Sequence, residues 1–268
     1  MNTTENEIQA LHKEIDDLRN ENIALYNELT KQNKILFEQI ISIGKELANQ
    51  QAAISDNFKF IRGQSLSTYL TLLTGMNTAK FIITNMNKAK VINDKNNYLK
   101  YVLSQVDVSG SYLEFGVYQG STINLISATL PDKIVYGFDS FEGLPETWRS
   151  GFYNQAFNMN GNLPQINKNV CLIKGWFNET LPDFVKEHPD PCAFIHVDCD
   201  LYSSTKTIFD NLKNQIIRGT VIAFDEYFYY PGWQEGEYKA FMELVKENDL
   251  KYKYIARTEH QQVAIKIL

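Results

Sequence analysis

The sequence predicts an α/β protein with a Rossmann-like, mostly parallel sheet of seven strands, helices on both faces and a coiled-coil helix before it. From Gly110 onward, short β-rich runs alternate with helical stretches, which is typical of a parallel sheet covered on both sides. Residues 1–55 follow a heptad instead. The 268 residues, 44% hydrophobic and 22% charged, suffice for one large domain and an appendage.

The heptad predicts that residues 1–55 form a coiled coil through which the chain forms a homo-oligomer. One seam position is taken by Ile8, Ile15, Asn22 and Leu29, and the other by Leu11, Leu18 and Leu25. β-Branched residues at the first position, Leu at the second and one Asn favour a parallel dimer. From Leu36 the apolar series is displaced by four residues, a stutter that locally unwinds the supercoil. The alternatives are a single amphipathic helix packed on its own domain, three strands, or a dimer of dimers.

Residues 56–109 show mixed helical patterns and are expected to form a helical lead-in to the domain at 110–268. Within that domain the expected strands lie in residues 111–118, 134–141, 169–177, 192–202, 219–228, 251–256 and 261–268. The last two runs are close enough in the chain to form an antiparallel hairpin, with His260 near its turn.

Composition and charge argue against several classes of protein. The net charge of −6 makes nucleic acid an unexpected partner, because no excess of cations is available to contact phosphates. No basic start precedes an apolar run, and no apolar stretch reaches the roughly 18 residues that span a bilayer. The three cysteines form no Cys-x-x-Cys pair, so neither a disulfide framework nor a zinc site is indicated. We expect a cytoplasmic protein without a membrane span.

A glycine-bearing turn follows the first strand of the domain. Ligands bind at the carboxyl ends of strands in open α/β sheets, so this turn is a candidate site. Gly116 and Gly120 would let the backbone turn tightly and approach a ligand, and Ser121 or Thr122 would cap the following helix. Glu114 precedes the turn. A plain connection between strand and helix is an equally consistent interpretation.

An acidic residue ends the second strand of the domain. Asp139 follows Gly116 at close to the spacing at which such a residue accepts hydrogen bonds from ribose hydroxyls, which indicates a nucleoside cofactor. The turn lacks the G-x-G-x-x-G pattern that holds a pyrophosphate at a helix N-terminus. S-adenosylmethionine, which carries no phosphate, therefore suits this turn better than NAD.

Further carboxylates follow the fourth and fifth strands of the domain. Asp198 and Asp200 lie in HVDCDLY, and Asp225 and Glu226 lie in AFDEYF. Acidic side chains at adjacent strand ends repel one another, which raises a pKa or recruits a hard divalent cation such as Mg²⁺. Asp200 is as consistent with a cap on the following helix.

Several motifs together resemble the macrocin-type (TylF-like) sugar O-methyltransferases over roughly residues 110–245. The motifs are LEFGVYQGST, FDSFEGLPE, HVDCDLYSST, FDEYF and the turn Gly175-Trp176-Phe177 followed by Glu179-Thr180-Leu181-Pro182. The resemblance implies a class I S-adenosylmethionine-dependent methyltransferase fold that uses Mg²⁺ to methylate a sugar hydroxyl. It does not extend to the heptad region.

The resemblance also implies roles for individual residues. Glu114, Gly116, Gly120 and Ser121 would surround the methionine part of the donor, Asp139 and Ser140 the ribose, and Trp176 and Phe177 the adenine. Asp198, Asp225 and Glu226 would hold the metal, with Glu226 where Asp is usual. Family members that modify macrolide sugars use a His between the second and third strands, and this chain has none there. This departure leaves the substrate and the proton acceptor open, and Asp198 is our candidate for the acceptor.

We thus expect an enzyme that methylates a glycan, nucleotide sugar or glycosylated metabolite. A nucleotide-sugar oxidoreductase would need a pyrophosphate turn and a Tyr-x-x-x-Lys acid/base set, which we do not expect here. A non-catalytic scaffold on a degenerate methyltransferase fold is the other alternative.

Other conspicuous residues have two interpretations each. His196 is more consistent with a packed strand residue than a catalytic one. A group of aromatic residues would form either a sugar-stacking wall or ordinary packing, namely Tyr227, Phe228, Tyr229, Tyr230 and Trp233. Residues 151–169 would form an acceptor-binding lid or only a surface excursion.

Overall fold

The computed structural model describes residues 2–62 and 65–268, and the side chains of residues 6–56 and 65–268. The chain divides into two compact units, the first ending at Leu66 and the second spanning Ser67–Leu268. Within the described residues, no helix combines the length and the apolar character needed to cross a membrane.

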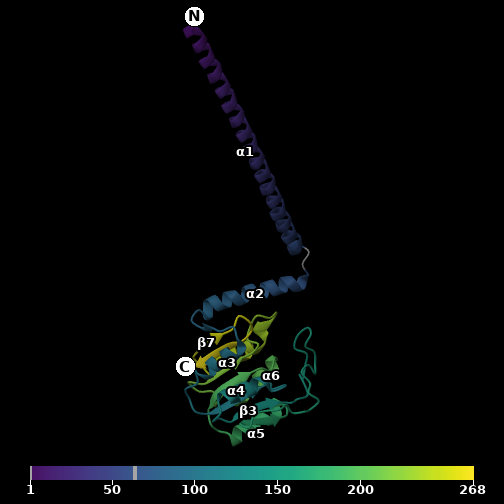
Figure 1. Ribbon diagram of the computed structural model, residues 1–268. Helices are drawn as coiled ribbons and strands as arrows, with labels where there is room; N and C mark the ends of the chain where they lie inside the picture. The colour runs from purple at the N-terminus through teal and green to yellow at the C-terminus, as the bar shows by residue number, and fades with distance from the viewer. Residues whose placement is uncertain (1, 63–64) are drawn as a thin grey trace. The chain divides into compact units, whose positions relative to one another are not determined.

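The first unit is one long helix, α1 (Asn2–Arg62), drawn in purple in Figure 1. It confirms the predicted helix. All of its described side chains are exposed within the single chain, including the apolar seam residues. The coiled coil itself stays a prediction.

The second unit opens with α2 (Leu66–Asn85), β1 (Lys90–Val91) and α3 (Lys95–Leu103). The expected helical lead-in contains these two helices and, in addition, the strand β1, which pairs in parallel with a strand near the far end of the chain. A strand of two residues is too short to show an alternating pattern, so the sequence gives no sign of it. The sheet therefore has eight strands where seven were predicted.

The sheet runs in the order β1-β7-β8-β6-β5-β2-β3-β4. Its remaining strands are β2 (Ser111–Phe115), β3 (Val135–Asp139), β4 (Val170–Lys174), β5 (Cys192–Val197), β6 (Val221–Phe224), β7 (Tyr252–Arg257) and β8 (Val263–Ile267). Neighbouring strands are parallel except that β8 is antiparallel to both β6 and β7. The sheet is thus mixed, and the predicted hairpin is confirmed with His260 between β7 and β8.

Helices cover both faces of the sheet, as predicted. The elements are α4 (Ser121–Thr129), α5 (Phe177–Glu187), α6 (Tyr202–Leu212), the short 3₁₀ helix η1 (Trp233–Glu235) and α7 (Glu237–Glu247). One core joins α5, α6 and α7 to strand residues such as Leu113 and Phe115, and the other joins α3 and α4 to Tyr112 and Phe194. Alternate residues of β2 therefore serve opposite cores, as the pleat requires.

The two central strands meet closely where they leave the sheet. Gly116 has φ of +92°, and a Cβ at this position would lie 1.7 Å from the carbonyl oxygen of Asp198. The Asp198 amide donates to the carbonyl of Phe115 at 2.9 Å, which locks the two chain segments together. Gly116 is therefore needed because another segment of backbone passes beside it, a reason that sequence reasoning did not identify.

Gly116→Ala is expected to lower the free energy of unfolding by about 3 kcal/mol or more, because it adds a backbone clash to a strained positive φ. Gly151→Ala is the matched control: Gly151 has φ of +90° and open space around its Cβ position, so only strain of about 1 kcal/mol is expected. Chemical denaturation of both variants measures the difference. Equal losses would show that the close approach to Asp198 contributes nothing.

Candidate active site

A cavity of about 870 Å³ lies at the carboxyl ends of the central strands. All the predicted site residues except Glu114 and Gly120 line it, which places Gly116, Ser121, Asp139, Ser140, Trp176, Phe177, Asp198, Asp225 and Glu226 around one space. These segments lie far apart in the sequence, from Gly116 to Glu226, and meet because parallel strands share one carboxyl edge.

Asp139, the last residue of β3, holds the glycine turn in shape. One carboxylate oxygen accepts hydrogen bonds from the amides of Val117 and Tyr118, both at 2.8 Å, and the other accepts from Phe141 at 2.7 Å. A carboxylate has about four acceptor positions, so one remains for a further donor. Asp139 thus has a structural function that the sequence did not reveal, and its contact with ribose stays a prediction.

The turn delivers the N-terminus of α4 to the cavity. Gly120 is the N-cap in the left-handed conformation and has no capping side chain, so the expectation that Ser121 or Thr122 caps this helix was wrong. Both residues belong to the first turn of α4 and line the cavity. The first-turn amides of a helix lack partners inside it and favour an anion, such as a carboxylate.

Trp176 and Phe177 differ in position although they are adjacent. Trp176 precedes α5 as its N-cap residue and forms part of the cavity wall. Phe177 also lines the cavity but packs edge-on against Phe115, with ring centroids 5.4 Å apart, and Phe115 stacks on Phe138. Core packing therefore fixes Phe177, and the contact of Trp176 with adenine stays a prediction.

Three carboxylates converge where β5 and β6 end. One oxygen atom from each of Asp198, Asp225 and Glu226 lies within 4.8 Å of the others. Burial, and then the charge of Asp225, hold the pKa of Asp198 well above its usual range; burial and the charge of Asp198 do the same for the pKa of Glu226. The Oε2 atom of Glu226 is buried and has no hydrogen-bond partner among the described residues. Such a set suits a hard divalent cation.

Lys95 is a site residue that sequence reasoning missed. It begins α3, and its Nζ atom lies 2.7 Å from Oδ1 of Asp225. Burial lowers the pKa of Lys95, but the charges of Asp225 and Asp198 outweigh burial and raise it. Asp94 caps α3 and could have revealed where this helix begins, but only the folded structure brings Lys95 to the acids.

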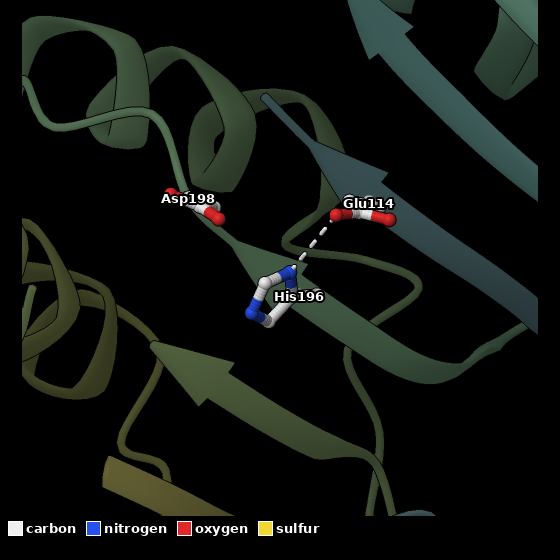
Figure 2. A group of neighbouring side chains, drawn as sticks. All are labelled: Glu114, His196 and Asp198. Carbon is white, nitrogen blue, oxygen red and sulfur yellow. Dashed lines mark hydrogen bonds and ion pairs between the residues drawn. The ribbon is translucent and has the colours of Figure 1, made fainter. Parts of the chain in front are cut away.

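His196 lies beneath the cavity floor between two acids. Figure 2 shows it on β5 beside Glu114, its register neighbour on β2, with Nδ1 3.4 Å from Oε1 of Glu114. Its Nε2 atom lies 3.9 Å from Oδ1 of Asp225. Burial lowers the pKa of His196, but the hydrogen bond to Glu114 raises it overall. His196 is therefore a packed residue that bridges acids, and Glu114 lies with it behind the cavity lining.

The aromatic residues after β6 do not form the predicted sugar-stacking wall. None of Tyr227, Phe228, Tyr229, Tyr230 and Trp233 lines the cavity, and all but Tyr229 are buried. Tyr227 and Trp233 pack against Phe81 of α2, with ring centroids 6.5 and 5.2 Å apart. Ordinary packing, the alternative interpretation, is the one that the structure supports.

A different aromatic wall borders the acids. Trp148, Phe152 and Phe157 line the cavity, and the guanidinium of Arg149 lies 3.7 Å from the ring centre of Trp148. The Ser203 hydroxyl donates to a Glu146 carboxylate oxygen at 2.6 Å, which ties this segment to α6. Sequence reasoning placed its lid at residues 151–169 and so missed Trp148 and Arg149, since nothing in their spacing marks them.

Asp200 is buried between the acids and Arg149. It has φ of +64° and is 7% exposed, and Leu201 rather than Asp200 is the N-cap of α6, so its interpretation as a helix cap was wrong. Burial raises the pKa of Asp200 to about 7, against the opposing charge of Arg149.

The second unit is similar to proteins of known family. The family described as macrocin O-methyltransferase (TylF) matches residues 71–248, most of the chain. The chain belongs to this family. The TylF match begins within α2 and includes every cavity-lining residue named above, while the whole of α1 lies outside it.

Two family relatives align with part of the chain. Demethyldecarbamoylnovobiocin O-methyltransferase of Streptomyces niveus is 26% identical over 166 residues, 53% of this chain and 62% of its own length. The 8-demethyl-8-(2,3-dimethoxy-alpha-L-rhamnosyl)-tetracenomycin-C 4'-O-methyltransferase of Streptomyces olivaceus is 28% identical over 143 residues, 45% of this chain and 54% of its own length. The chain thus spans about three fifths or less of these relatives.

Solved structures support the fold. The calicheamicin methyltransferase CalS11 matches with a TM-score of 0.51 and 19% identity, over 81% of this chain and 92% of its own. The O-methyltransferase NovP matches with a TM-score of 0.51 and 22% identity, over 64% of this chain and 78% of its own. Both comparisons support an α/β methyltransferase fold for the second unit.

Asp200→Asn is expected to flatten the pH dependence of stability in metal-free protein. A carboxyl whose pKa is higher in the folded than in the unfolded chain stabilises at low pH, and this stabilisation disappears as pH rises from about 4 to about 7. Over that window the free energy of unfolding of the wild type should fall relative to the variant by a few kcal/mol. Asn tolerates the positive φ at this position. The free energies of unfolding of wild type and variant are measured by denaturation between pH 4 and pH 8. If their difference does not change with pH, the raised pKa of Asp200 is contradicted.

Proposed function

We propose that the chain is an S-adenosylmethionine-dependent O-methyltransferase that uses a divalent cation, such as Mg²⁺, to methylate a sugar hydroxyl of a glycan, nucleotide sugar or glycosylated metabolite. The observation that carries this proposal is the convergence of Asp198, Asp225 and Glu226 on the cavity that also receives the glycine turn. Family membership and relatives named as O-methyltransferases support it.

The donor would bind across the turn and β3. The amides at the N-terminus of α4 suit its carboxylate, and Ser121 adds a hydroxyl. Asp139 retains one free acceptor position for a ribose hydroxyl, and Trp176 offers a ring face to the adenine. Glu114 lies behind the cavity lining, so it would affect the donor site through its contact with His196 rather than by touching the donor.

The residues present fit a divalent cation. One carboxylate oxygen from each of the three acids lies within 4.8 Å of the others, and Oε2 of Glu226 is buried without a partner among the described residues, which suits the oxygen ligands that Mg²⁺ prefers. A bound cation would lower the pKa of an acceptor hydroxyl and orient it. Asp198 would accept the proton of that hydroxyl at a carboxylate oxygen. The side chains of Lys95 and His196 hold Asp225 in position through the contacts described above.

The acceptor sugar would lie between the acids and the aromatic wall. The rings of Trp148 and Phe152 offer apolar faces to the C–H groups of a sugar. The guanidinium of Arg149 has no hydrogen-bond partner among the described residues, so its N–H groups are available to sugar oxygens, and Asp200 can accept from a hydroxyl. We further propose a cytoplasmic location and no nucleic-acid partner, from composition and charge alone.

An oxidoreductase is less consistent with the site. The chain has no G-x-G-x-x-G turn, but a Tyr-x-x-x-Lys spacing does occur at Tyr202 and Lys206, contrary to our expectation. Neither residue lines the cavity, since the Tyr202 hydroxyl donates to Glu243 at 2.8 Å and Lys206 pairs with Asp210. That pair therefore forms surface contacts on α6 and α7. The full set of acids argues against a degenerate scaffold.

Asp225→Asn is expected to weaken Mg²⁺ binding at least tenfold while changing S-adenosylmethionine binding less than about threefold, since it removes a charged ligand without altering shape. Calorimetric titration of wild type and variant with each molecule measures both. Asp183→Asn, which removes an exposed acid on α5, is the control and should change neither affinity.

Methyl transfer from radiolabelled S-adenosylmethionine to a panel of nucleotide sugars should depend on Mg²⁺ and fall at least a hundredfold in Asp225→Asn. Excess chelator should abolish it. The proposal fails if the wild type shows no heat with S-adenosylmethionine, as an oxidoreductase or scaffold would behave. It fails equally if the variant loses the donor and keeps metal dependence.

A further inference from the structure

Helix α1 carries a long apolar seam that the single chain leaves exposed. Its 61 residues extend for about 90 Å. Exposure of the seam residues in the first four heptads runs from 46% at Ile15 to 62% at Leu25. Exposing this apolar stripe to water is unfavourable along the whole helix, and burying it against a second surface removes that cost.

The seam has the composition of a two-stranded coil. Ile8 and Ile15 stand at one core position, and Leu occupies the other position in three successive heptads. Asn22 interrupts the apolar series. Once the seam is buried in a two-stranded coil, its amide needs a polar partner on the second helix, and an equivalent Asn provides one. A second copy of this chain, aligned in register, presents that group at the same height.

The charges beside the seam distinguish the two orientations of such a pair. One flank carries Glu at every heptad, namely Glu7, Glu14, Glu21 and Glu28, and the other flank carries His12, Arg19, Tyr26 and Asn33. In a parallel pair opposite flanks meet, so Glu14 of one chain faces Arg19 of the other. In an antiparallel pair like flanks meet, which sets Glu against Glu. The arrangement of charge therefore favours the parallel pair.

We infer that α1 pairs with α1 of a second copy as a parallel, in-register coiled coil over residues 7–29, and that the chain is a dimer. This inference is independent of the proposed function. The weak contact between Arg19 and Asp16 within one helix, at 3.6 Å and with both side chains mostly exposed, leaves Arg19 able to reach a partner. Because both chains run in the same direction, both methyltransferase units follow the same end of the coil.

Beyond residue 29 the seam shifts but continues. Leu36, Ile40, Ile43, Leu47 and Ile54 extend it after the stutter, and Ile35, Phe37 and Ile41 widen the apolar surface there. A wider surface is also what a third chain would cover, so the number of chains is part of the test.

Cysteine cross-linking tests the orientation in the full chain. Leu11→Cys and Leu25→Cys, each in a Cys171→Ser background that removes the exposed native thiol, should both form a disulfide-linked dimer under mild oxidation. An antiparallel pair can align at most one of these positions with itself, so cross-linking of one alone, or of neither, would overturn the inference. Asn20→Cys, on the opposite side of the helix, is the matched control and should cross-link poorly.

Charge exchange tests the pairing. Glu14→Arg should weaken the dimer about tenfold because it faces Arg19 of the partner in two symmetric contacts, and the double variant Glu14→Arg, Arg19→Glu should restore wild-type affinity. Sedimentation equilibrium measures both, with circular dichroism to confirm that the second unit stays folded. A monomeric or trimeric wild type, or a double variant as weak as the single one, would overturn the inference, whatever the outcome of the donor and metal titrations.

Discussion

Repulsion between buried carboxylates dominates the carboxyl edge of the sheet. Six acidic side chains meet there: Glu114, Asp198, Asp200, Asp225, Glu226 and Glu237. The nearby cationic groups are Lys95, Arg149 and, when protonated, His196. Burial and mutual repulsion therefore raise the pKa of several of these acids. An edge of this kind is costly for a fold unless a cation balances it, which supports the proposal that a divalent cation binds there.

The same edge depends on close backbone contacts that hold the acids in place. Gly116 lets β2 leave the sheet against the backbone of Asp198, and Asp139 binds three amides of the neighbouring turns. These contacts join the half of the cavity that is proposed to bind the donor to the half that holds the acids. Because the two halves share one rigid turn, a molecule bound at the α4 N-terminus lies at a defined position relative to Asp198.

The proposed acceptor site draws on another part of the chain. The segment that carries Trp148 and Arg149 closes one side of the cavity and is tied to α6 by Glu146 and Ser203. Its β-bridge joins Arg149 to Phe152 within the segment itself, outside the strand pairs of the sheet, so its residues can change with little effect on the sheet. Relatives that methylate different compounds would be expected to differ most in this segment.

Periodicity and strand-end motifs determined the α/β class, both helical layers, the closing hairpin, the long α1 helix and a part of the cavity lining that includes Asp139, Asp198 and Asp225. These features follow from local spacing, because parallel strands bring their carboxyl ends to one edge wherever the intervening chain runs. Only the tertiary structure decided the short strand β1, the pairing of Lys95 with Asp225, the core position of Tyr227 and the exposure of Trp148 to the cavity. Each of these features depends on which segments, distant in the sequence, pack against each other. The spacing of residues within one segment does not reveal such contacts.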